Sequence, residues 1–259
     1  VVYPSNTLQG EFATLNTSNR WDNGIFYTTP NWGGFEVKAA YAFGEVVKST
    51  TGLSNAKTSV NGDTSDAGRF GVAARYNNGP VDVVAMYQMI QKNDSLKTDL
   101  TSQSLDDGNS GWSIGGSYDF KVVKAFASYQ KETDQRAKGT VGTYSVTAKD
   151  GLVSQTTYAA QDFDKTLWSV GVTVPVTAAG KVIVEYVNFK VEDNLKTSAA
   201  DQKSTGWGVG YEHAFSKRTT GYAAVSRITN NENSKFAFGG VGATDENNTN
   251  FGVGLRHTF

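Results

Sequence analysis

Apolar and polar residues alternate with a period of two along most of this chain. In segment 251–259, for example, Phe251, Val253 and Leu255 fall on one face, and Gly252 and Gly254 fall on the other. Such alternation is typical of β-strands that have one apolar and one polar face. It predicts about eleven strands, at 21–29, 35–43, 69–76, 81–89, 112–120, 123–130, 168–174, 182–186, 207–215, 222–228 and 251–259. The phase of 222–228 is ambiguous, because Ala223–Val225 fits either face.

The connections between these segments alternate in length. Short ones lie near 30–34, 77–80, 120–122, 175–181 and 214–217. Long polar ones lie near 46–66, 94–108, 134–163, 192–202 and 230–247. Strict alternation predicts an up-and-down meander in one domain, with all long loops at one end of the sheet.

Composition excludes several classes of protein. The chain has no cysteine and only two histidines, which excludes disulfides, thiolate metal sites and multi-histidine metal sites. Lys and Arg number 24 against 25 Asp and Glu, so the basic excess of a nucleic-acid-binding protein is missing. No apolar run is long enough for a transmembrane helix. We therefore expect no metal, no cofactor and no nucleic-acid partner.

The polar faces decide between a soluble sheet and a membrane barrel. They carry Gly, Ser and Thr with scattered charges, which suits a water-filled interior behind an apolar face turned to lipid. Aromatic residues also gather at both ends of the apolar faces, as in the two interfacial girdles of a membrane barrel. They are Trp21, Phe70, Trp112, Trp168, Trp207 and Phe251 at one end, and Tyr27, Tyr76, Phe120, Phe215 and Phe259 at the other. The sequence thus predicts an all-β, transmembrane, antiparallel up-and-down β-barrel.

Several segments resemble one family. Residues 22–35 (DNGIFYTTPNWGGF), 41–45, 75–80, 210–219 and 254–259 are similar to strand and turn motifs of Gram-negative general porins. The nearest group is the anion-selective Omp32-type porins of beta-proteobacteria. The terminal Phe259, which follows an alternating strand, also resembles the assembly signal of bacterial outer-membrane proteins.

The resemblance implies an integral outer-membrane protein and a homotrimer of 16-stranded barrels, each with a loop folded inward as a constriction. Only about eleven strands are predicted here, so we expect about five more to precede them. Residues 1–19 would then be the remnant of the constriction loop, and 20–259 the barrel. The alternative is that 8–15 forms a twelfth strand and closes a small barrel. Expected partners are outer-membrane lipid, lipopolysaccharide, small anions and hydrophilic solutes.

The resemblance also places Arg20 at the pore constriction, with Glu11 as the best acidic candidate on the loop. A rim arginine paired with a carboxylate is the alternative for Arg20. Ten further charged residues have the parity of the lumen face, and many of them are expected to pair across neighbouring strands. They are Lys38, Arg69, Arg75, Lys124, Arg256, Glu36, Asp82, Asp119, Glu185 and Glu212.

The expected function is a water-filled channel for passive diffusion of small hydrophilic solutes and ions, with anion preference implied by the resemblance. A substrate-specific channel would need an aromatic slide or a dense ladder of charges of one sign on the lumen face. The only aromatic residues predicted there are Phe26, Phe126 and Phe189. A barrel enzyme or adhesin is the third alternative, but no nucleophile is evident beside His213 or His257, which have lipid-face parity. Acidic loop residues that could bind divalent cations or bridge lipopolysaccharide, with plain solvated charge as the alternative, are Asp106, Asp107, Asp162, Asp164, Asp245 and Glu246.

Overall fold

The computed structural model describes residues 23–43, 46–49, 62–65, 68–90, 109–136, 142–147, 153–158, 161–193, 201–231, 234, 236–237, 240–241 and 247–259. Eleven strands form one sheet in the order β1-β2-β5-β6-β7-β8-β11-β12-β13-β14-β17. Their bounds are β1 Gly24–Thr28, β2 Phe35–Ala42, β5 Arg69–Asn78, β6 Val81–Ile90, β7 Asn109–Asp119, β8 Lys124–Arg136, β11 Gln161–Pro175, β12 Gly180–Asp193, β13 Gln202–Ala214, β14 Thr219–Asn231 and β17 Asn248–His257. Every predicted strand is therefore present.

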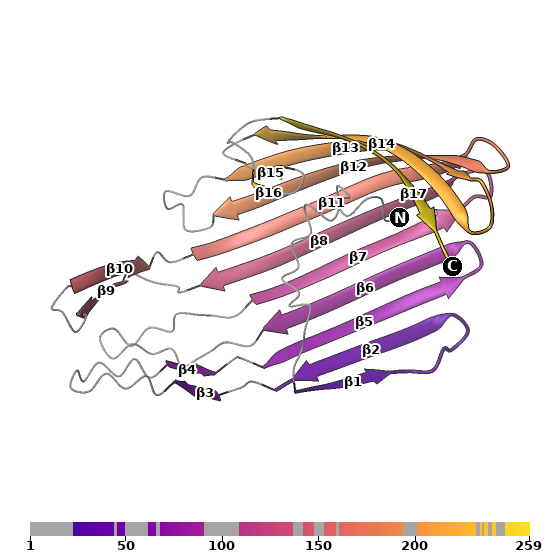
Figure 1. Ribbon diagram of the computed structural model, residues 1–259. Coiled ribbons are helices and arrows are strands. Elements are labelled where there is room, and N and C mark those ends of the chain that lie inside the picture. Colours follow the sequence, from indigo (N-terminus) through magenta and orange to yellow (C-terminus); the bar gives the residue numbers. More distant parts are fainter. Residues whose placement is uncertain are drawn as a thin grey trace.

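Each strand of the sheet is antiparallel to the next. Short turns join strands at one end of the sheet, and long connections join them at the other, as Figure 1 shows. The predicted up-and-down meander is confirmed. The sheet also curls, so that β13, β14 and β17 turn over the remaining strands (Figure 1).

Three of the long connections contain a short pair of strands that the sequence did not predict. These pairs are β3 (Val46–Ser49) with β4 (Gly62–Ser65), β9 (Gly142–Thr147) with β10 (Val153–Tyr158), and β15 (Phe236–Ala237) with β16 (Gly240–Val241). They lie in polar sequence because antiparallel pairing is a property of the backbone and needs no apolar face.

Several strands are longer than the apolar alternation indicates. β8 has 13 residues, β11 has 15 and β12 has 14, all extending into segments predicted as loops. The ladder of hydrogen bonds between β8 and β11 continues from the Trp168–Tyr129 pair to the Gln161–Arg136 pair. The strands therefore run past the aromatic girdle at the long-connection end.

The final strand begins and ends earlier than predicted, because β17 spans Asn248–His257. β17 ends at His257, whereas the alternation of 251–259 runs to Phe259. Beyond the strand, the Thr258 amide donates a hydrogen bond of 2.9 Å to the Arg218 carbonyl in the β13–β14 turn. β14 begins at Thr219, directly after this turn. The pair of Thr219 with His257 is therefore the last one in the ladder between β14 and β17.

The register settles the phase of β14. Ser226 lies opposite Gly208, and Asn230 opposite Ser204, so Tyr222, Ser226 and Asn230 share the polar face of β13. Arg227 lies opposite Trp207 and therefore falls on the apolar face.

The two edge strands, β1 and β17, each pair with one neighbour among the described residues. The sheet is therefore open between them in this part of the chain. No helix in the described ranges is long and apolar enough to cross a membrane.

Candidate functional site

The two faces of the sheet differ sharply in composition and in exposure. We define the outer face as the one that carries Trp112, Trp168 and Trp207, and the inner face as the one that carries Arg75, Ser204 and Glu212. On the outer face of β13, Trp207, Val209 and Tyr211 are each 37–43% exposed. On the inner face of the same strand, Ser204 is 0% and Glu212 5% exposed. This inversion of a soluble protein's pattern is the property required of a wall between lipid and water.

All ten charged residues predicted to face a lumen lie on the inner face by register. Arg75 lies opposite Glu36, Lys124 opposite Asp119, and Arg256 opposite Thr220. The remaining members are Lys38, Arg69, Asp82, Glu185 and Glu212. The structure places these residues on one surface, and their role in selectivity stays a prediction.

Arg75 and Asp82 form a two-pronged ion pair across the β5–β6 hairpin. Arg75 Nε donates to Asp82 Oδ1 at 2.8 Å, and Nη2 donates to Oδ2 at 2.7 Å. The planar guanidinium matches the two carboxylate oxygens, which fixes both side chains along the wall. Both remain open to solvent, with side-chain exposures of 54% and 33%. Water and salt therefore screen the pair.

Lys181 is an inner-face residue that the sequence analysis missed. Its Nζ lies 3.0 Å from Oε2 of Glu212, whose side chain is only 6% exposed. Alternation along the strand could have identified it, since Lys181 is four residues from Glu185 on β12 and therefore lies on the same face. On β2, Lys38 and Glu36 form a similar pair at 3.2 Å.

Most of these charges lie near the short-turn ends of their strands. Arg75 and Asp82 flank the β5–β6 turn, and Asp119 and Lys124 flank the β7–β8 turn. Positive and negative side chains are thus interspersed around one mouth of the curled sheet. Such a surface presents local fields of both signs rather than one dense charge.

The inner face is not uniformly polar. Leu167, Val187, Phe189 and Ile228 form a buried apolar cluster on β11, β12 and β14, with exposures of 0–3%. Beside it, the Ser204 hydroxyl donates a 2.8 Å hydrogen bond to Oδ1 of Asn230. At this place the inner face is therefore packed side chain against side chain. The alternation of polar and apolar residues predicts the face on which a residue lies, but not which side chains pack against it.

The aromatics that a specific channel would use do not line up. Phe26 on β1 is 64% exposed, whereas Phe189 on β12 is 3% exposed within the apolar cluster. Phe126 lies on β8 with its ring over Gly171, where an added Cβ would come within 2.2 Å of the ring. The three rings sit on separate strands and do not form a continuous slide among the described residues.

Both histidines lie on the outer face beside aromatic rings. His213 Nδ1 is 3.0 Å from the Tyr211 hydroxyl, and its ring centroid is 5.0 Å from that of Phe215. His257 Nδ1 is 2.8 Å from the Thr219 hydroxyl, with Phe259 at 5.0 Å between centroids. These contacts suit side chains at a membrane interface.

Other predicted site residues fall outside the described residues. These are Arg20 and Glu11, together with the side chains of Asp106, Asp107, Asp162, Asp245 and Glu246. Asp164 is described, and it contacts Lys131 and Thr133 on the outer face. In the described part of the chain, no group of three or more His, Asp or Glu residues is placed to hold a metal ion.

Comparisons with known proteins agree with this geometry. A family model described as Gram-negative porin matches residues 2–234. An outer membrane porin protein of Bordetella pertussis is 31% identical over 255 residues, covering 95% of this chain and 60% of that protein. Outer membrane porin protein 32 of Delftia acidovorans is 28% identical over 252 residues, covering 93% and 57%. The chain thus spans somewhat less than two thirds of the length of these relatives.

Solved structures give the same result. The anion-selective porin from Comamonas acidovorans superposes with a TM-score of 0.63 at 25% identity, covering 92% of this chain and 60% of that one. OmpT of Vibrio cholerae in its trimer form gives a TM-score of 0.58 at 16% identity, covering 99% and 70%. The second match shows the shared fold alone.

Proposed function

Because this chain belongs to the Gram-negative porin family, we propose that the complete protein forms a water-filled channel for passive diffusion of small hydrophilic solutes and ions. Family membership makes the chain an integral protein of the bacterial outer membrane. Members of this family are channels rather than enzymes.

One observation carries the proposal. An antiparallel sheet of eleven strands exposes aromatic and aliphatic side chains on its outer face and gathers ion pairs on its inner face. Lipid accepts the first surface, and the ion pairs on the second suit contact with water and ions. The sheet is curled rather than flat, as Figure 1 shows.

Anion preference is the finer part of the proposal. Its support is the similarity to a porin that is described as anion-selective. The inner-face charges near the short turns are close to balanced, because Lys38, Arg75 and Lys181 are paired with acidic neighbours. A few cationic groups at a narrow point would therefore set the preference, and Arg20 is our candidate.

We also propose a place in the channel for the start of the chain. Residues 1–19 would be the end of an inward-folded constriction loop that carries Glu11, and residues 20–259 would be part of the barrel wall. Further strands would close the barrel, and three copies would assemble as a trimer. The trimer form of a solved neighbour with the same fold supports the last step.

The test is the reversal potential of the complete folded protein in a planar bilayer across a KCl gradient. Stepwise conductance with an anion-favouring potential is the expected result. Conductance steps with a cation-favouring potential would support the proposed channel but contradict the proposed anion preference. Folded protein without conductance would overturn the proposed function.

The substitution Arg20→Glu tests the constriction. It replaces a fixed positive charge by a negative one, so the reversal potential is expected to move towards cation preference. Lys217→Glu is the matched control, because Lys217 lies in the exposed β13–β14 turn. Equal shifts for both variants, or none for Arg20→Glu, would remove Arg20 from the constriction.

A further inference from the structure

Glu185, on the inner face of β12, differs from the carboxylates around it. It is half-buried, and no residue of the described ranges forms an ion pair or a hydrogen bond with its side chain. In the same ranges, a lysine or arginine contacts Glu36, Asp82, Glu132, Asp164, Glu192 and Glu212, and the Lys121 amide donates to Asp119. A half-buried carboxylate without a partner loses hydration and gains nothing in return, so it needs a physical reason.

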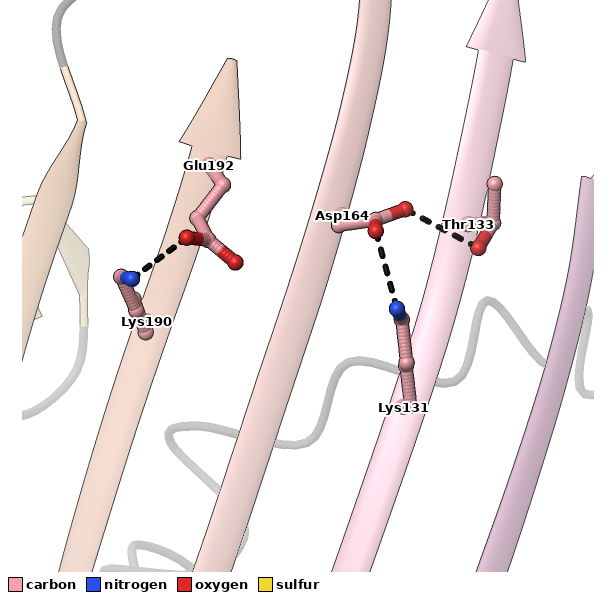
Figure 2. Close-up of polar contacts among 5 residues, drawn as sticks. All are labelled: Lys131, Thr133, Asp164, Lys190 and Glu192. Carbon is pink, nitrogen blue, oxygen red and sulfur yellow. Dashed lines mark hydrogen bonds and ion pairs between the residues drawn. The ribbon is translucent and has the colours of Figure 1, made fainter. Parts of the chain in front are cut away.

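The outer face of the neighbouring strands shows how carboxylates are usually accommodated. Figure 2 shows Lys131 on β8 pointing at Asp164 on β11, with Lys131 Nζ 2.9 Å from Asp164 Oδ2. The same figure shows Lys190 beside Glu192 on β12. Glu192 and Glu185 are seven residues apart on one strand, so alternation places these two carboxylates on opposite faces of the sheet.

Glycines on both neighbouring strands explain why Glu185 has no cross-strand partner. It lies directly opposite Gly171 on β11 and Gly208 on β13, so neither strand offers a side chain at this level. Along β12, the next residues on the same face are Ile183 and Val187, and both are apolar. The carboxylate therefore lies in a recess of the inner wall, with glycine on two sides and apolar residues on the other two.

The inner-face lysines of nearby strands are engaged by other carboxylates. Lys181 is four residues from Glu185, or about 13 Å of extended chain, and its Nζ lies 3.0 Å from Glu212. Lys124 lies two strands away, on β8, directly opposite Asp119. The described wall therefore supplies no counter-charge to Glu185.

An aromatic ring lies beside the recess. Phe126 on β8 is directly opposite Gly171, and a Cβ added to that glycine would come within 2.2 Å of the ring. Gly171 in turn lies directly opposite Glu185, so only one strand, about 5 Å wide, separates the ring from the strand that carries the carboxylate. Both side chains are partly exposed, so a solute on the inner face can reach them.

A carboxylate beside an aromatic ring has the chemistry to bind an organic ammonium ion. The carboxylate accepts charge-assisted hydrogen bonds from the ammonium N–H groups, and the face of the ring attracts the cation. Calcium and magnesium ions instead require six or more oxygen ligands. In the described part of the chain, no group of three or more His, Asp or Glu residues could hold such an ion. The partly exposed Ile183 also suits the hydrocarbon part of an amine.

We propose that Glu185 and Phe126 form a subsite of the channel wall that binds organic ammonium ions, such as primary amines. The ammonium group would lie between the carboxylate and the ring, at the level of Gly171. The inference rests on the proposed function, because solutes reach the inner face only if it lines a water-filled channel. A bound ammonium ion would neutralise Glu185 and so strengthen the preference of the wall for anions.

The test measures the reversal potential of the complete folded protein across a KCl gradient, while n-butylammonium chloride is added equally to both sides. Because binding neutralises Glu185, the potential is expected to move towards anion preference and to saturate. Glu185→Gln is expected to start at the more anion-favouring potential and to show no saturating shift. An equal shift in Glu185→Gln, or one that grows without saturating in the unchanged protein, would overturn the proposal.

The ring has its own pair of variants. Phe126→Leu keeps an apolar side chain but removes the aromatic face, so half-saturation is expected to require about threefold more amine. Phe126→Tyr keeps the ring and is expected to respond like the unchanged protein. Equal half-saturation in these two variants would show that the ring takes no part, and the proposed subsite would be wrong.

Two other glutamates provide matched controls. Glu192→Gln makes the same change on the outer face of the same strand, and the response to the amine is expected to persist. Glu36→Gln removes an inner-face carboxylate that already contacts Lys38 at 3.2 Å. It is expected to shift the starting potential but to keep the saturating response. A loss of response in Glu36→Gln as complete as in Glu185→Gln would indicate a diffuse effect of lumen charge and would reject a site at Glu185.

Conductance in KCl alone separates this inference from the proposed function. Conductance steps without a saturating response to the amine would reject the subsite and leave the channel intact. Folded protein without conductance would reject the channel, and the subsite that depends on it would be rejected as well.

Discussion

Two adjacent glycines in the turn between β1 and β2 differ in what they can tolerate. Gly33 has φ +64°, and an added Cβ would meet nothing within 4 Å. Gly34 has φ +101°, and its Cβ would come within 2.4 Å of the Asn77 carbonyl oxygen. The approach is close because the Asn77 amide donates to the Gly34 carbonyl at 2.8 Å.

We therefore predict that Gly33→Ala costs about 1 kcal/mol of folding free energy, from backbone strain alone. Gly34→Ala adds a backbone clash to a conformation that few other residues adopt, and is expected to cost more than about 2 kcal/mol. Urea unfolding of the protein in lipid vesicles measures both. Equal losses in the two variants would show that the turn relaxes away from Asn77.

The Arg75–Asp82 pair gives a residue-scale prediction on selectivity. Asp82→Asn leaves the Arg75 charge uncompensated on the inner face, so anion preference is expected to rise. Arg75→Gln is expected to shift preference the other way, and the double variant to lie near the unchanged protein. Stability should hardly change, because exposed pairs contribute little. The shifts should shrink at high salt, where reversal potentials repeated in concentrated KCl provide the check.

At the scale of a strand, β13 has two adjacent residues on opposite faces of the sheet, one expected to contact lipid and the other water. Val209 is 39% exposed on the outer face. Gly210 faces inward, and its Cβ would make only ordinary contacts, 3.6 Å from Ala224 Cβ and 3.7 Å from the Ala223 carbonyl oxygen. Both lie between the aromatics Trp207 and Phe215, at similar depth.

Val209→Arg is expected to destabilise the folded protein by about 2–4 kcal/mol, because it puts a charge against hydrocarbon. Gly210→Arg puts the same charge against water and is expected to fold normally while increasing anion preference. The folded fraction after refolding into vesicles, read from heat-dependent gel mobility, distinguishes them. Equal tolerance of both arginines would mean that the outer face is not in lipid.

Strands were predictable where alternation was clean, and this limit has a physical origin. Parity in β13 and β17 follows directly from the sequence, because large apolar residues alternate with glycine. In β14, Ala223, Ala224 and Val225 fit either face, and only pairing with β13 decides between them. The extra strand pairs in the long connections follow from backbone pairing, which leaves no trace in polarity.

The site was predictable only in part, for a related reason. Parity places Arg75 and Asp82 on one face, but their contact depends on the diagonal offset between β5 and β6. The Lys131–Asp164 pair joins strands separated by a long connection, so its register cannot be read from the sequence. The predicted strands also ended near the aromatic residues. The charged residues beyond these ends were therefore assigned to loops.

At the scale of the whole molecule, the two open edges set the last constraint. The outward edges of β1 and β17 have no partner strand in the described ranges, and each backbone polar group left unpaired in hydrocarbon costs several kcal/mol. A sheet of this kind needs either further strands or a direct β1–β17 seam before it can remain in a bilayer. We infer the former, since the chain covers 60% of a relative's length.

We therefore predict that a polypeptide limited to residues 1–259, refolded into lipid vesicles, gives no heat-modifiable band and no stable conductance. The complete porin, refolded in parallel, should give both, together with a trimer that dissociates on boiling. The edges are the reason, because β1 and β17 each have one pairing partner among the described residues. A folded, conducting product from residues 1–259 alone would show that β1 and β17 close on each other, or that 8–15 supplies the missing strand. In that outcome the eleven strands would form a small barrel of their own, and the proposed constriction loop at 1–19 would be wrong.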